Sequence, residues 1–74
     1  MVEKEQKAYL HSFGKHVESI KKRKNLSYRK IAAACDIEHS DIKRYVDGQI
    51  NPTLLSLIEL AKGLDIHPKE LLNF

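Results

Sequence analysis

The chain has 74 residues, enough for one domain with a single small core, and its net charge is +3. Its only cysteine, Cys35, excludes an internal disulfide, so we expect the reducing environment of a cytoplasm. No apolar run approaches the ~20 residues that span a bilayer, and the first residues show no signal-peptide pattern, so we expect no membrane association.

The positive charge is concentrated in one part of the chain. Residues 13–30 hold seven of the 13 Lys and Arg residues and a single acid, Glu18, which gives this stretch a net charge of +6. Residues 31–48 have a net charge of −2. A basic patch of this kind fits contacts with phosphates, although a solvated, lysine-rich helix face explains it equally well.

The first element is an amphipathic helix whose buried stripe is Leu10, Phe13, Val17 and Ile20 at 3-4-3 spacing. Residues 1–12 are predicted to be its polar N-terminal extension, and residues 13–74 are predicted to form the folded domain. Asn25 is expected to end this helix.

Two short helices follow. Ser27 is a favourable N-cap for a helix that carries Ile31, Ala32 and Cys35 inward. A third helix is predicted over about residues 38–47, and Gly48 supplies the left-handed stop that helix C-termini favour.

The last two helices complete an all-α chain. Thr53 is expected to cap a fourth, strongly apolar helix, and Pro68 suits the first position of a short fifth helix that carries Leu71 and Leu72. The sequence therefore predicts a compact bundle of five helices.

The most informative pattern lies between residues 28 and 47. Two short helices cross steeply only when the residue at their contact is small and the turn is tight, and Ala32 and Ile37 satisfy these requirements. Ile42 and Tyr45 then anchor the next helix from its inner side. The outer face of that helix keeps polar groups, as insertion into a major groove requires. The predicted core of this motif is Ile31, Ala32, Cys35, Ile37, Ile42 and Tyr45.

These residues, together with the segments Gly48 to Thr53 and Leu60 to Ile66, resemble the lambda repressor-like (Xre/Cro-type) helix-turn-helix family. The resemblance covers about residues 13–73 and needs no gap. It implies a five-helix domain that regulates transcription by binding double-stranded operator DNA, with a palindromic site bound by a two-fold homodimer.

The resemblance also implies which residues contact DNA. His39 and Ser40 match positions at which family members read bases. Lys43 and Arg44 match positions that reach bases or the adjoining backbone, and we expect them to read bases as well. Contacts with the DNA backbone are expected from Tyr28, Arg29, Gln49 and Asn51. For Tyr28, packing of its ring on the first helix is an equally good interpretation.

The chain departs from the family at several positions. Asp36 and Asp65 stand where the family favours glycine in a left-handed turn, a conformation that aspartate tolerates better than most residues, so we expect both turns to persist. Glu38 replaces the usual Ser or Thr cap of the third helix. Asp41 places a negative charge on the face expected to approach DNA.

Other functions have weaker support. The acids Asp36, Glu38, Asp41 and Asp47 motivate an alternative in which the fold is an antitoxin-like or accessory module that binds a protein partner. Non-specific nucleic-acid binding through the basic stretch Lys21 to Lys30 is a third interpretation. The histidines and the lone cysteine lack metal-ligand spacing, and no nucleophile–base set or glycine-rich loop is present, so no enzyme, metal or cofactor is expected.

Three apolar residues near the end of the sequence, Leu71, Leu72 and Phe74, are candidates for a dimer contact. A dimer through them is expected to place two copies of the third helix about one DNA turn apart, ~34 Å.

Overall fold

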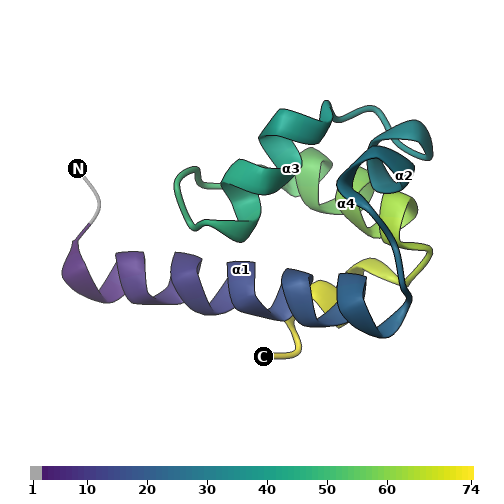
Figure 1. The fold of residues 1–74 in the computed structure, drawn as a ribbon. Helices are drawn as coiled ribbons and strands as arrows, with labels where there is room; N and C mark the ends of the chain where they lie inside the picture. The colour runs from purple at the N-terminus through teal and green to yellow at the C-terminus, as the bar shows by residue number, and fades with distance from the viewer. Residues whose placement is uncertain (1–2) are drawn as a thin grey trace.

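The computed structural model describes residues 3–74, so Met1 and Val2 of the predicted extension lie outside the described residues. Its described part forms α1 (Lys4–Arg23), α2 (Tyr28–Ala33), α3 (His39–Val46), α4 (Leu54–Leu64) and a final 3-10 helix, η1 (Pro68–Leu72). In Figure 1, α1 runs along one side of the molecule, and the other α-helices lie together across it. The prediction of an all-helical chain is confirmed for these residues.

The prediction of a fifth α-helix is wrong, because Pro68–Leu72 is a 3-10 helix. The backbone N–H groups of Glu70 and Asn73 donate to carbonyls three residues earlier, at 2.9 and 3.3 Å. A segment of only five residues satisfies more of its backbone with this tighter hydrogen-bond pattern than with an α-helical one.

The first helix is regular from Lys4 onward. The Glu3 N–H donates to the Gln6 side-chain carbonyl at 3.1 Å, which ties the first turn together. Residues 3–9 are exposed, whereas Phe13, Val17 and Ile20 are buried. The helix therefore projects its first turns beyond the core that its middle covers (Figure 1).

The remaining helix ends follow the predicted residues. The Ser27 hydroxyl accepts from the Lys30 N–H and the Thr53 hydroxyl accepts from the Ser56 N–H, both at 3.1 Å. Gly48 is left-handed with φ +70°, and Asn25 takes the same conformation with φ 56° where α1 ends. These turns need no long-range contact to form, because capping side chains and left-handed residues act locally.

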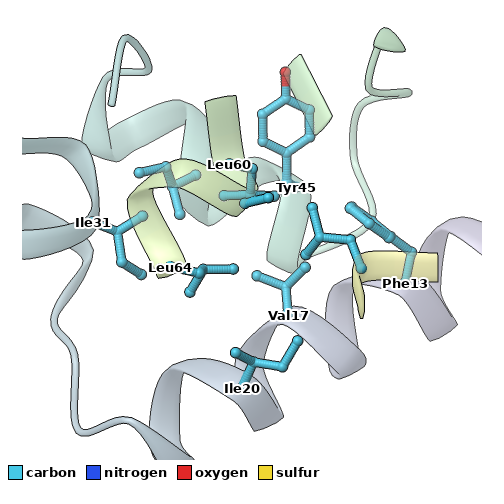
Figure 2. Packing of buried hydrophobic residues seen from close by; sticks show 10 residues of the cluster. Phe13, Val17, Ile20, Ile31, Tyr45, Leu60 and Leu64 are labelled. Carbon is cyan, nitrogen blue, oxygen red and sulfur yellow. The ribbon is translucent and has the colours of Figure 1, made fainter. Parts of the chain in front are cut away.

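One hydrophobic cluster joins all five helices. Figure 2 shows side chains from α1, α2, α3 and α4 converging on a common centre, with the Tyr45 hydroxyl at its edge. The buried members are Phe13, Val17, Ile20, Ile31, Ile42, Tyr45, Leu60, Ala61, Leu64 and Leu71. Since α3 contributes Ile42 and Tyr45 to this core, its opposite face is left for solvent.

A glycine sets the distance between α1 and α3. A Cβ atom on Gly14 would collide with the Val46 carbonyl and would lie 2.8 Å from the Tyr45 carbonyl oxygen. These are backbone atoms of a packed helix, so they cannot rotate away. Gly14 therefore allows α3 to rest directly on α1.

A second glycine plays the same part between α2 and α4. A Cβ atom on Gly63 would lie 2.7 Å from the Ile31 carbonyl oxygen and 3.0 Å from the Cys35 sulfur. The two glycines thus let α1 pack closely against α3 and let α4 pack closely against α2.

None of the helices between residues 3 and 74 combines the length and apolar character that crossing a bilayer requires.

The Gly14 contact is testable by Gly14→Ala. Alanine favours an isolated helix, but here its methyl group forces α1 and α3 apart, and we expect a loss of about 1–3 kcal/mol in the free energy of unfolding. Urea unfolding followed by circular dichroism measures it. Ser12→Ala, at an exposed position of the same helix, is the control and should stay within about 0.5 kcal/mol of the parent. A Gly14→Ala protein as stable as the control would contradict the contact.

Candidate nucleic-acid interface

The outer face of α3 presents the four predicted base-reading residues to solvent. His39 and Ser40 form its first turn and are exposed. The Lys43 and Arg44 side chains are 58% and 54% exposed, so neither is covered by another part of the described chain. The inner face is anchored by Ile42, which is fully buried, and by Tyr45. An apolar inner face with hydrogen-bonding groups opposite is the arrangement that docking into a major groove requires.

The turn between α2 and α3 is packed as the sequence predicts. Ile31 is fully buried, and Ala32, Cys35 and Ile37 pack against the core cluster. The Cys35 thiol donates to the Ile31 carbonyl at 3.2 Å. Burial raises the pKa of this thiol, which keeps it protonated and suits a packing role.

The backbone conformation at Asp36 differs from the predicted left-handed turn. Asp65 is left-handed as expected, with φ 57°, whereas Asp36 is absent from the positive-φ residues of the described chain. The Asp36 N–H instead donates to a Glu59 carboxylate oxygen at 2.9 Å. This long-range hydrogen bond from α4 fixes the turn without a left-handed residue. Nothing in the sequence singled out Glu59.

Tyr28 opens α2 and is held by α1. Its hydroxyl donates to Glu18 at 2.9 Å, and the Lys21 ammonium lies 4.7 Å from the centre of its ring. Burial, this hydrogen bond and the negative charges of Glu18 and Asp47 raise the pKa of Tyr28 to about 12. The ring therefore packs against α1, one of the two predicted alternatives, and a phosphate contact by its hydroxyl stays a prediction.

The other predicted backbone contacts lie at two places. Arg29 borders the same surface hollow as Glu38 and His39, beside the start of α3. Gln49 and Asn51 are exposed in the connection between α3 and α4, and the Gln49 N–H donates to the Arg44 carbonyl at 2.9 Å. The two groups thus lie at opposite ends of α3, which is where a docked recognition helix is flanked by phosphates.

Both cations of α3 are paired with acids, one within the helix and one at its C-cap. Lys43 lies 3.2 Å from Asp47, and Arg44 lies 3.6 Å from Asp41. Asp41 and Asp47 are therefore in direct contact with two of the four predicted base-reading residues.

The three candidates for a dimer contact differ in exposure. Leu71 is the buried residue of η1 and is fully covered, so it cannot contact a second subunit, and its inclusion was wrong. Leu72 and Phe74 are 60% and 51% exposed. The ring of Phe74 lies edge-on to that of Phe13, with 6.2 Å between the ring centres.

Sequence reasoning missed a second exposed apolar group on α4. Leu54, Leu55 and Ile58 are exposed on its first two turns, at 72%, 74% and 42%. The strongly apolar composition of α4 was a signal for them, because its apolar residues cover more than the one face that the core can bury.

The described chain resembles known proteins in both sequence and structure. A helix-turn-helix family model (HTH_3) matches residues 17–71. The control protein C.BamHI of Bacillus amyloliquefaciens is 35% identical over 63 residues, which span 84% of this chain and 78% of that protein. The crystal structure of the restriction-modification controller protein C.AhdI from Aeromonas hydrophila superimposes with a TM-score of 0.81 at 33% identity, covering 86% of this chain and 97% of that one.

The family model covers most of the chain, including the whole of α2, the turn and α3. The exposed polar face of α3 is the surface that this fold uses to read DNA. The chain therefore belongs to the lambda repressor-like helix-turn-helix family and is a sequence-specific DNA-binding transcriptional regulator.

Proposed function

We propose that this chain is a controller-type regulator that binds a palindromic operator as a homodimer and sets the transcription of restriction–modification genes. The observation that carries the proposal is the outer face of α3, with Lys43 and Arg44 exposed, on a fold that matches a restriction-modification controller protein over nearly all of that protein's length. This role implies that the protein acts in the cytoplasm, in association with the nucleoid.

The base contacts are assigned to α3. Arg44 and Lys43 have the donors and the reach to bind O6 and N7 of guanine, the commonest specific contact in the major groove. Ser40 and His39, one turn earlier, are placed to contact bases nearer the helix N-terminus. Arg29, Gln49 and Asn51 hold the register by bonding phosphates at the two ends of α3, and Tyr28 joins them if its hydroxyl leaves Glu18.

The dimer is assigned to an exposed apolar surface made by α1, α4 and the residues around η1. Tyr9, Leu72 and Phe74 border one hollow that is lined mainly by apolar atoms. Leu54, Leu55 and Ile58 extend the apolar surface along α4. Six large apolar side chains of a small domain remain in water here, and a contact between identical patches removes them from it.

The base contacts are tested with Arg44→Ala and Lys43→Ala. We expect each variant to lose about 1–3 kcal/mol of operator binding, since each removes a contact with a base edge, and to relax sequence preference at one position. The operator is first obtained by selection from random duplexes, and affinities are then measured by gel shift at fixed salt. Lys69→Ala removes a cation from η1, away from α3, and is the matched control. Wild-type affinity in both α3 variants would refute the assignment.

The dimer surface is tested with Leu55→Asp. Leu55 is 74% exposed and lies in the first turn of α4, where a carboxylate is favourable, so the monomer should keep its fold. We expect the dimer dissociation constant to rise at least about tenfold, because a charge is desolvated at the interface. Sedimentation velocity measures it. Ser12→Asp, at an exposed site of α1, should leave association unchanged, and equal association of the two variants would place the dimer contact elsewhere.

A further inference from the structure

The ion pairs of the described chain involve three acids. Within residues 3–74 there are four ion pairs, and every one is formed by Glu18, Asp41 or Asp47. Asp41 and Asp47 pair with the two cations of α3. Glu18 pairs with Lys21 at 3.6 Å and with Lys22 at 4.0 Å. The other acids of the described chain form no ion pair, so both cations of the predicted base-reading helix are paired while most acids are not.

Glu18 lies on α1 and contacts the first residue of α2. It accepts the Tyr28 hydroxyl, and the Lys21 that it pairs lies over the Tyr28 ring. Glu18 therefore lies beside the start of the helix-turn-helix, where Tyr28 is a predicted contact with the DNA backbone.

Stability does not explain three of the four pairs. The Lys43, Arg44 and Lys22 side chains are more than half exposed, and ion pairs between exposed side chains contribute little to folding. On DNA, however, the same charges face phosphates. Each of these three exposed cations is paired with a carboxylate that repels phosphates, so the surface attracts any DNA sequence far less than its lysines and arginine suggest.

We propose that Glu18, Asp41 and Asp47 suppress binding to DNA of unrelated sequence by holding the contact cations in the free protein. In an unrelated duplex, a cation leaves its carboxylate only for a phosphate, and the freed carboxylate then faces the DNA unpaired. In the operator, guanine edges take Arg44 and Lys43, and a cytosine amino group can occupy Asp41. Asp41 and Asp47 thus widen the gap in affinity between operator and unrelated DNA, whereas Glu18 lowers the affinity for both. This inference rests on the proposed function and names a determinant of its specificity.

Glu18 gives the sharpest test, because it lies outside the base-reading helix. Glu18→Gln removes the charge and keeps an oxygen that accepts the Tyr28 hydroxyl. We expect it to bind unrelated duplex about tenfold more tightly near 0.1 M salt, because the exposed Lys22 becomes available for one further phosphate, whereas the Lys21 side chain is only 17% exposed. The slope of log affinity against log salt should steepen by about one for the operator and for unrelated duplex alike. Asp47→Asn, which frees Lys43, should also raise affinity for unrelated duplex and should lower the ratio of operator to unrelated affinity.

A control of equal charge separates this effect from a general one. Glu70→Gln on η1 makes the same change in net charge, and its affinity for unrelated duplex should change by less than about twofold. Thermal unfolding of each variant confirms that folded proteins are compared.

Either of two results would overturn the inference. One is Glu18→Gln affinity for unrelated duplex equal to or weaker than that of the parent. The other is an equal gain in Glu70→Gln, which would show a general charge effect. The proposed function fails separately, if the parent selects no operator or if Arg44→Ala leaves operator binding unchanged.

Discussion

The contact of α1 with α3 through Gly14 is the constraint on which the rest of the molecule depends. Without a side chain at Gly14, the end of α3 rests on the backbone of α1, and Ile42 and Tyr45 enter the core from there. A helix of only eight residues has little stability of its own, so it is held by this packing and not by its propensity. Because its inner face is fully used, its outer face is free to contact another molecule.

Much of this arrangement is encoded locally and was predictable. The residues Ser27, Gly48 and Thr53 mark helix ends through hydrogen bonds and backbone conformations that form within a few residues. The 3.6-residue spacing of apolar side chains identified which face of each helix is buried, and with it the exposure of Lys43 and Arg44. A surface helix with one apolar face has few other ways to pack, so the spacing of apolar residues predicted both the fold and the exposed face of α3.

The features that the sequence did not reveal are long-range. Gly14 and Gly63 are ordinary helix residues until a second helix is known to cross them. The hydrogen bond from Asp36 to Glu59 joins residues 23 apart, and it removed the need for the left-handed turn that local reasoning predicted. Leu71 was predicted to be available for a partner, yet η1 turns it into the core beside α1. Spacing along the chain identifies faces, whereas tertiary contacts decide what covers them.

Two side chains, one within α1 and one directly after it, are also bound to main-chain oxygens far along the sequence. Lys24 donates to the Asp65 carbonyl at 2.8 Å, and His16 lies 2.6 Å from the Glu70 carbonyl. These contacts join residues 41 and 54 positions apart. The same helix that supports α3 through Gly14 is thus fastened to the segment that follows α4, so a disturbance at either place is transmitted to the other through one continuous rod.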